Sequence, residues 1–228
     1  MKLMDKEKKY SNITCMFFIL FFCFSPQSLA LYVESDISDF SAKDGFSSKK
    51  YVNNTKSTNI YSLSVKKILK PGENEIEIPI EDGELLFSPK KKVLLPNEWE
   101  FFKFYFNGKK DNRERYYRII ISELSLSTFE DEEIKKSTYI LPKIGLDTYL
   151  IIRPAEINFD YFFNGKSLKN TGNTYFRVVI HNSCNDENPN YFYLLPNEEF
   201  AGRSLQSSGN KYLIFMDRII LLEKKCTD

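Results

Sequence analysis

The sequence predicts an all-β protein, and three observations support this prediction. Residues that favour strands are abundant, with 20 Phe and 14 Tyr among 228 residues. Short segments in which apolar and polar residues alternate recur along the chain, the pattern of half-buried strands. Turn signals such as Pro71-Gly72 and Asn164-Gly165 separate these segments. No repeat with a fixed period stands out.

The expected strands fall into two groups, and antiparallel sandwiches take about 100 residues each. Two sandwich domains are therefore expected, at 31–153 and 154–228. Their junction is placed at Arg153-Pro154, because proline cannot donate to a strand ladder and favours an extended residue before it. The expected strands are Ile60–Val65, Glu75–Ile80, Glu100–Phe106, Arg115–Ser122, Tyr149–Ile152, Ile157–Phe163, Tyr175–Ile180, Tyr191–Leu195 and Lys211–Phe215, with a further one over Asp217–Leu222.

The first 30 residues have the pattern of a cleaved signal peptide. A lysine-rich start precedes the apolar run Met16–Phe24, and Ser28-Leu29-Ala30 provides small residues at a cleavage site. The alternative is a transmembrane anchor, which needs about 20 apolar residues and is disfavoured by the short run. We expect export, cleavage after Ala30 and no membrane insertion after cleavage.

Two cysteines, Cys184 and Cys226, remain after this cleavage. An even pair in an exported chain predicts a disulfide, because the destination is oxidising. The alternative is two unrelated thiols.

Charge and motifs exclude several functions. Lys+Arg 32 against Asp+Glu 31 leaves a net charge of +1, too little for a protein that binds nucleic acid through bulk positive charge. His181 is the single histidine, and no hydrolase, phosphate-binding or metal-ligand motif occurs. We expect no enzymatic activity, no cofactor and no metal site. The acidic run at 130–133 is interpreted as a solvated loop rather than a pair of catalytic carboxylates.

An ordered set of segments carries a family resemblance. Ser88-Pro89 and Leu95-Pro96 precede an aromatic strand at Glu98–Phe106, and Arg113-Glu-Arg-Tyr-Tyr-Arg118 begins the next strand. The second half contributes Phe159–Asn173, Cys184 and Tyr191–Pro196. Together they resemble the periplasmic pilus (fimbrial) chaperones of the chaperone–usher pathway, and most of all the common-pilus class.

The resemblance implies two immunoglobulin-like domains in an L and a periplasmic, non-enzymatic protein. Such chaperones bind pilus subunits by donor-strand complementation and deliver them to an outer-membrane usher. Strand addition uses main-chain hydrogen bonds for affinity and alternate side chains for specificity. The expected working edge is Tyr139–Ile152, where Ile140, Pro142, Ile144 and Leu146 share one parity. The alternative is that these residues complete the chaperone's own core.

Further residues take roles from the resemblance. Arg153 and Glu114 match an interdomain ion-pair cluster, with two unrelated surface charges as the alternative. The family anchors the subunit's terminal carboxylate with an Arg in its first strand and a Lys four residues before the Arg-Pro pair. Here 31–40 has no basic residue and the second position is Tyr149. Either other groups such as Lys143 or Arg118 form the anchor, or this class lacks it.

A function from another class stays open. The chain is alternatively a secreted β-sandwich pilus subunit or adhesin. Subunits lack a final strand, whereas this sequence predicts strands close to its end. A secreted hydrolase ranks third, because the necessary motifs are missing.

Overall fold

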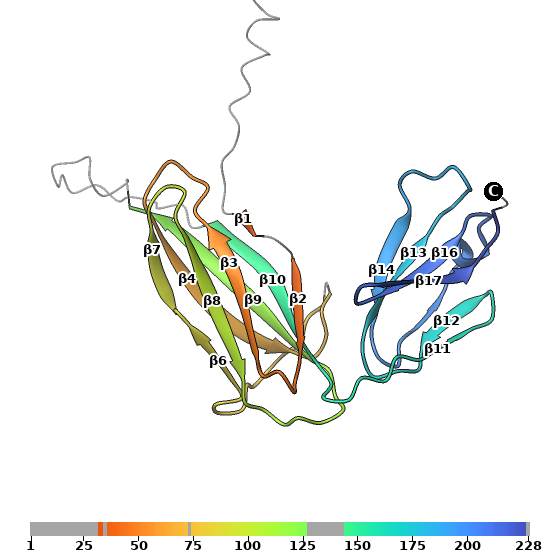
Figure 1. Cartoon of the computed structure of the whole chain (residues 1–228), viewed down its shortest axis with the longest axis horizontal. Coiled ribbons are helices and arrows are strands. Elements are labelled where there is room, and N and C mark those ends of the chain that lie inside the picture. Colours follow the sequence, from red (N-terminus) through yellow and green to blue (C-terminus); the bar gives the residue numbers. More distant parts are fainter. Residues whose placement is uncertain (1–31, 34–35, 73, 127–143, 227–228) are drawn as a thin grey trace, which may run out of the picture.

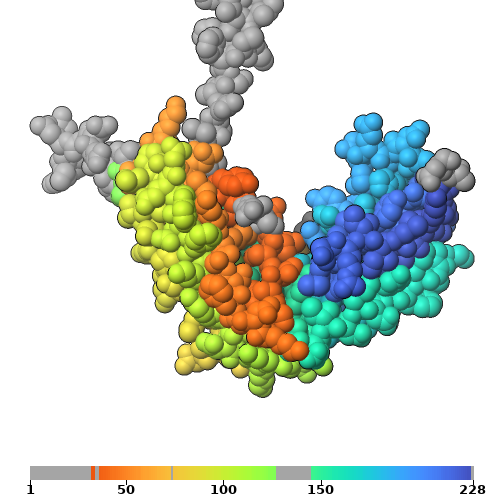
Figure 2. All heavy atoms as spheres, in the orientation of Figure 1, coloured from red at the N-terminus to blue at the C-terminus, as the bar shows by residue number. Residues whose placement is uncertain are grey.

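The computed structural model describes residues 32–33, 36–72, 74–126 and 144–226, and it confirms the all-β prediction. Within this part of the chain, one 3₁₀ helix, Arg203–Gln206, accompanies the strands. No helix there is long and apolar enough to cross a bilayer. The strands form two bodies that diverge from one joint (Figure 1). The space-filling view shows a cleft between them (Figure 2). The proposed signal peptide lies outside the described residues.

The first body consists of two sheets with a shared core. One has the strand order β1-β3-β8-β6, and the other has the order β2-β10-β9-β4-β5 with β7 also paired to β4. Strand β2 runs parallel to β10, whereas the other pairs are antiparallel. The strands are β1 (Tyr32–Val33), β2 (Ile37–Ser41), β3 (Phe46–Val52), β4 (Asn59–Ile68), β5 (Glu77–Ile78), β6 (Leu85–Ser88), β7 (Lys91–Leu94), β8 (Trp99–Phe106), β9 (Arg115–Ser125) and β10 (Ile144–Arg153).

The second body is smaller and also has two sheets, with the orders β11-β12-β15 and β14-β13-β16-β17. Strand β17 pairs with β16, so the late strand expected near the end of the chain is present. The division of the chain at Arg153-Pro154 stays a prediction. The strands are β11 (Tyr161–Phe163), β12 (Ser167–Asn170), β13 (Phe176–Ile180), β14 (Asn190–Leu194), β15 (Glu199–Ala201), β16 (Lys211–Phe215) and β17 (Arg218–Glu223).

Each body has its own apolar core, and a third cluster joins them. Buried aromatic residues such as Tyr51 and Phe102 fill the first core, and Phe176 lies in the second. In the third cluster, Ile68, Tyr116 and Ile151 of the first body pack with Tyr175 of the second, and Leu195 covers them. Burial of these side chains holds the joint together, because removing apolar area from water stabilises the packed state.

The two bodies share an internal repeat that the sequence analysis missed. The segment Leu-Leu-Pro-Asn-Glu occupies both 94–98 and 194–198. Its asparagine has a positive φ in each copy, 64° at Asn97 and 65° at Asn197. Each copy is held by a buried asparagine side chain, Asn53 bonding Leu94 O at 3.0 Å and Asn170 bonding Leu194 O at 2.9 Å. A single repeat across 100 positions has no short period, so periodicity alone does not reveal it.

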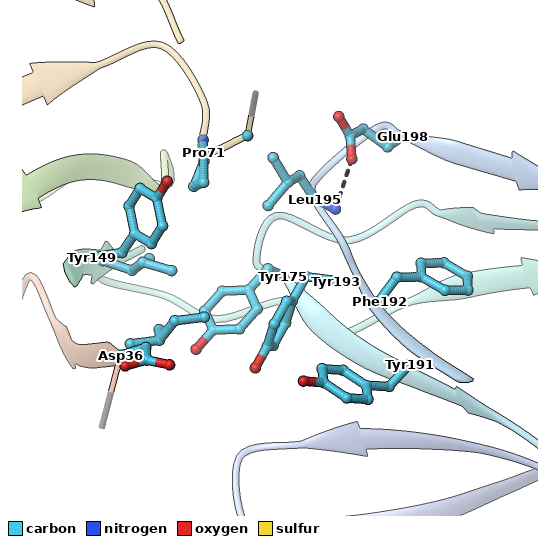
Figure 3. Close-up of a pocket in the computed structure, with 12 residues that line it drawn as sticks. Asp36, Pro71, Tyr149, Tyr175, Tyr191, Phe192, Tyr193, Leu195 and Glu198 are labelled. Carbon is cyan, nitrogen blue, oxygen red and sulfur yellow. Dashed lines mark hydrogen bonds between the residues drawn. The ribbon is translucent and has the colours of Figure 1, made fainter. Parts of the chain in front are cut away.

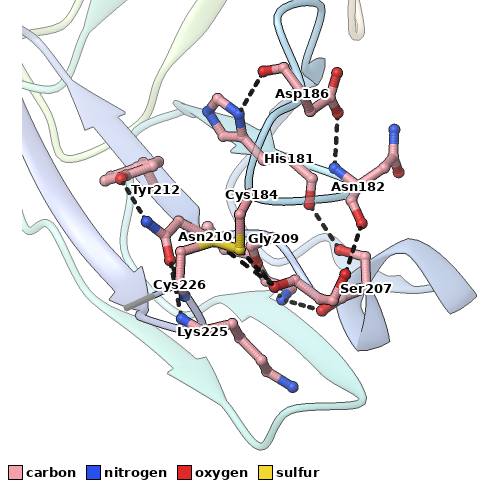
Figure 4. The surroundings of a disulfide bond; sticks show 12 residues. His181, Asn182, Cys184, Asp186, Ser207, Gly209, Asn210, Tyr212, Lys225 and Cys226 are labelled. Atoms are coloured by element: carbon pink, nitrogen blue, oxygen red, sulfur yellow. Dashed lines mark hydrogen bonds between the residues drawn. A yellow bond between two sulfur atoms is a disulfide. The ribbon is translucent and has the colours of Figure 1, made fainter. Parts of the chain in front are cut away.

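The predicted disulfide between Cys184 and Cys226 is confirmed (Figure 4). It attaches the end of the chain to the loop after β13, across a sequence separation of 42. The backbone N–H of Cys226 also donates to Asn210 Oδ1 at 3.0 Å. The buried ammonium of Lys211 pairs with Glu223 at 2.8 Å, so edge strand β17 is held by covalent and ionic contacts.

Candidate functional site

The first half of β10 has one edge without a described partner strand. Residues Ile144–Ile152 pair with β9, but β2 pairs with β10 only from Tyr149 to Arg153. Over Ile144–Thr148, the backbone groups on the second edge therefore have no ladder partner within the described chain. An open strand edge of this kind is a template for pairing with another chain.

Every second side chain of β10, from Thr148 to Ile152, is buried in the first body. Thr148, Leu150 and Ile152 are buried, and the two apolar residues belong to the first core. Leu146 continues this row by parity, but it is half-buried and stands outside the described core cluster. The apolar row of the core is thus extended along the strand into the open-edge segment.

Two of the four edge residues predicted from the sequence lie in the part of the chain that the structure describes, and two lie outside it. Ile144 pairs with Glu123 and Leu146 pairs with Ile121, so both belong to β10. Ile140 and Pro142 lie outside the described residues, as does the candidate anchor Lys143. The assignment of this set as a binding edge stays a prediction.

Arg153, at the end of β10, joins the two bodies. Its guanidinium pairs with Asp39 of β2 at 3.0 Å and donates to the hydroxyl of Thr174 at 2.6 Å. It also lies over the ring of Tyr175, 4.3 Å from the centroid. Burial acts to lower the pKa of Arg153, but the hydrogen bond to Asp39, with electrostatic contributions from Tyr175, Asp39 and Glu114, raises this pKa above its ordinary value.

Glu114 bonds to the same part of the second body. Its carboxylate accepts from Thr174 Oγ1 at 2.6 Å, from the backbone N–H of Tyr175 at 3.0 Å and from Tyr116 Oη at 2.7 Å. Burial raises the pKa of Glu114, although these donors act in the opposite direction. The Thr174 hydroxyl therefore stands between Glu114 and Arg153, and the direct ion partner of Arg153 is Asp39.

Sequence reasoning missed Asp39, Thr174 and Tyr175. Tyr175 Oη donates to Asp39 Oδ2 at 2.5 Å, so these groups close the network around Arg153. Asp39 lies far from Thr174 and Tyr175 in the chain, and the three belong to no motif, so no signal in a single sequence pairs them.

The candidate anchor Arg118 is engaged by carboxylates of its own chain. Its guanidinium lies 2.9 Å from Glu75 and 3.1 Å from Glu77. Tyr149 is its cross-strand partner, and Tyr149 Oη donates to Glu75 at 2.5 Å. Burial, with the hydrogen bond to Glu75, raises the pKa of Tyr149 to about 12. The position where the resemblance expects a lysine thus carries a neutral hydroxyl that already has an acceptor.

A pocket opens between the two bodies beside this strand (Figure 3). Tyr149 and Pro71 lie on the side of the first body, and Tyr191, Tyr193 and Leu195 on the side of the second. Within the described residues, no group of three or more His, Cys, Asp or Glu side chains is arranged to hold a metal ion.

Curated relatives cover most of the chain. It is 34% identical over 209 residues to the "Probable fimbrial chaperone EcpE" of Escherichia coli O18:K1:H7, covering 89% of this chain and 88% of the relative. It is 28% identical over 183 residues to the "Probable fimbrial chaperone EcpB" of Escherichia coli O1:K1, covering 77% and 82%. No family model matches the chain.

Solved structures share the fold. The class 5 fimbriae chaperone CfaA superposes with a TM-score of 0.53 at 17% identity, over 87% of this chain and all of that one. The Salmonella enterica complex of the SafA pilin with the SafB chaperone gives a TM-score of 0.54 at 15% identity, over 86% and 92%. The likeness confirms the predicted fold, two immunoglobulin-like domains.

Proposed function

The chain belongs to the family of fimbrial chaperones that includes EcpE and EcpB. From this membership we propose that it binds pilus subunits by donor-strand complementation. The observation that carries the proposal is the open edge of β10 over Ile144–Thr148. In this proposal, the edge supplies a strand that an incomplete subunit lacks. Main-chain hydrogen bonds give affinity, and alternate side chains of β10 enter the subunit's groove.

The parity of β10 fits this role. Leu146 continues the row of Leu150 and Ile152, which already fill the core of the first domain. A subunit that covers the open edge would extend that core across both proteins. It would also remove from water an edge that otherwise invites aggregation.

The rest of the domain supports the edge. Arg153 ends β10 and is held from both domains, through Asp39 in the first and Thr174 in the second. This network fixes the strand's far end, so its free half projects beside the cleft. We assign 31–153 to the domain that supplies the strand and 154–228 to the second domain.

Location and delivery complete the proposal. We propose that residues 1–30 direct export to the periplasm, and that the bound subunit passes to an outer-membrane usher. The alternative, a pilus subunit, is disfavoured because β17 completes the last sheet of the second domain. A subunit would instead lack a closing strand.

The experiment is co-expression with the subunits of its own pilus, followed by purification from the periplasm. The wild-type chaperone should elute as a 1:1 complex with a smaller subunit. A double variant, Ile144→Asn with Leu146→Asn, should stay folded but lose the subunit, which is then degraded. The control is Gly145→Ala, which lies between them on the opposite face, where an added Cβ meets nothing within 4 Å.

Three outcomes would contradict the proposal. The first is that the double variant retains its subunit at normal yield. The second is that the double variant loses several kcal/mol of stability, as a core truncation does. The third is that the wild type assembles into fibres by itself. The last result would indicate a structural subunit. Usher delivery is tested separately, by capture of the 1:1 complex on the purified usher.

A further inference from the structure

The interdomain pocket has a volume of about 570 Å³, and its lining includes Tyr149, the residue that follows the open segment of β10. Tyr149 of β10 stands on one side, and Tyr191 and Tyr193 of β14 stand on the other (Figure 3). Tyr175 forms part of the wall between them. Four tyrosine rings from two domains therefore line one space.

The hydroxyls of Tyr149 and Tyr175 already donate hydrogen bonds within the chain. Tyr149 Oη donates to Glu75 and Tyr175 Oη donates to Asp39, each at 2.5 Å. A hydroxyl has one proton to donate. Neither of these groups can donate to an incoming carboxylate without giving up a short bond to a charged acceptor.

The charges at the pocket are acidic. Asp36 and Glu198 line it, and no Lys or Arg is among its lining residues. Glu198 pairs with Lys70 at 3.2 Å, whereas the Asp36 carboxylate has no hydrogen-bond or ion partner among the described residues. Asp36 is exposed toward solvent and lies at the mouth of the ring of tyrosines.

Two of the neighbouring arginines are paired with carboxylates of the chain, and the third lies next to the pocket without lining it. Arg153 is buried behind Tyr175 and paired with Asp39, and Arg118 is held by Glu75. Arg177 lies 5.7 Å from the ring centroid of Tyr191, on the side of the second domain. An incoming carboxylate would thus meet the charge of Asp36 at the entrance, and Arg177, the cation beside Tyr191, is not among the residues that line the pocket.

We propose that this pocket receives a Lys or Arg side chain of the pilus subunit held by β10, in place of a terminal carboxylate. The inference rests on the proposed function for the identity of the partner. Aromatic faces attract cations through their quadrupole. The Asp36 carboxylate adds an opposite charge at the entrance. Together the rings and the carboxylate select the sign of the side chain that enters.

The test uses the free chaperone and small probes, so it needs no subunit. Tyrosine ring signals are followed by NMR while N-acetyl-arginine amide, N-acetyl-glutamine amide or sodium acetate is added. The arginine probe should shift the signals of Tyr149, Tyr191 and Tyr193 and saturate in the millimolar range. The neutral amide and acetate should leave them in place at the same ionic strength.

Variants assign the site. Asp36→Asn should lower the affinity for the arginine probe by roughly fivefold, as expected for the loss of one opposite charge near 4 Å in a solvated site. Asp82→Asn, which removes another exposed carboxylate of the first domain, should leave binding unchanged. The inference is overturned if acetate shifts the same tyrosines more strongly, if no probe binds, or if the Asp36→Asn variant binds arginine equally well.

A second experiment separates this inference from the proposed function. In periplasmic co-purification, Asp36→Lys should reduce the subunit yield while the β10 edge is intact. If the wild type recovers no subunit at all, the proposed function fails, whatever the probes show. If the wild type recovers its subunit and acetate is the probe that binds, the function stands and the cation pocket is wrong.

Discussion

Arg153 donates a hydrogen bond of 2.6 Å to the hydroxyl of Thr174, across the joint between the two domains. The same hydroxyl lies 2.6 Å from Glu114, so one buried threonine connects a cation and a carboxylate. This relationship links the end of β10 to the second domain, and the other half of the same strand carries the open edge.

The first prediction concerns this threonine. Thr174→Val keeps the shape but removes both hydrogen bonds, leaving two buried charged groups with fewer partners. Hydrogen bonds to charged groups contribute about 1.5 to 3 kcal/mol each, so the free energy of unfolding should fall by about that amount for each of the two bonds lost. Denaturant titration measures it, and small-angle scattering should show a wider spread of domain angles. Ser183→Ala, which removes an exposed hydroxyl of the same domain, serves as the control. An unchanged stability would mean that the network contributes nothing.

The second prediction concerns the disulfide. Replacing Cys184 and Cys226 together by serine should cost up to about 4 kcal/mol, the chain-entropy estimate for a loop closed across 42 positions. The loss should appear as a lower melting temperature of the second domain. Mass spectrometry of the exported protein should show a gain of two hydrogens on reduction. Two freely alkylated thiols in the native protein would refute it.

The third prediction is a pH dependence centred on Glu84. Burial by itself acts to raise its pKa, but bonds from Lys67, the Glu81 N–H and Tyr117 together lower it below the ordinary 4.5. A lowered folded-state pKa means that the stabilisation is present above about pH 4.5 and is lost as the pH falls through the folded value.

Glu84→Gln should therefore lower stability by about 3 kcal/mol at pH 7, because Lys67, 2.7 Å away, loses its partner in a nearly buried site. Its stability should also fall less steeply than that of the wild type below pH 4.5. Chemical unfolding at several pH values measures both. Glu81→Gln is the exposed control, and parallel pH profiles for Glu84→Gln and the wild type would contradict the assignment.

The fourth prediction concerns export. Cleavage after Ala30 should leave a periplasmic protein that begins at Leu31, because small residues flank that bond. N-terminal sequencing of the periplasmic fraction decides it. A periplasmic chain that still begins at Met1 would show the assignment to be wrong.

The sequence predicts the fold class well because the long central strands have clear patterns. β4, β8 and β9 each contain an expected strand, with aromatic or β-branched residues at buried positions. β3 was missed, since Ser47–Lys50 shows no apolar alternation and pairing with β8 holds it in the sheet. The expected strand Glu75–Ile80 is reduced to Glu77–Ile78, and Pro79 after it cannot donate to the ladder.

Only part of the candidate site can be proposed from sequence. Parity selects Leu146 and the Arg-Pro pair selects Arg153 as candidates, because both features are local in sequence. The partner of Arg153, Asp39, comes from a parallel strand that lies 114 positions earlier. The tyrosine pocket needs strands of two domains to face each other, and that arrangement depends on packing at the joint rather than on any one segment.

The most direct test of the central claim is amide hydrogen exchange of β10, in the free chaperone and in its complex with a pilus subunit. In the free protein, amides on the open edge of Ile144–Thr148 should exchange faster than those of Tyr149–Ile152, which are paired on both sides. In the complex, exchange at Ile144–Thr148 should slow to the level of a central strand. Unchanged exchange there, with protection appearing on another surface of the chaperone, would show that β10 is not the strand that the subunit receives.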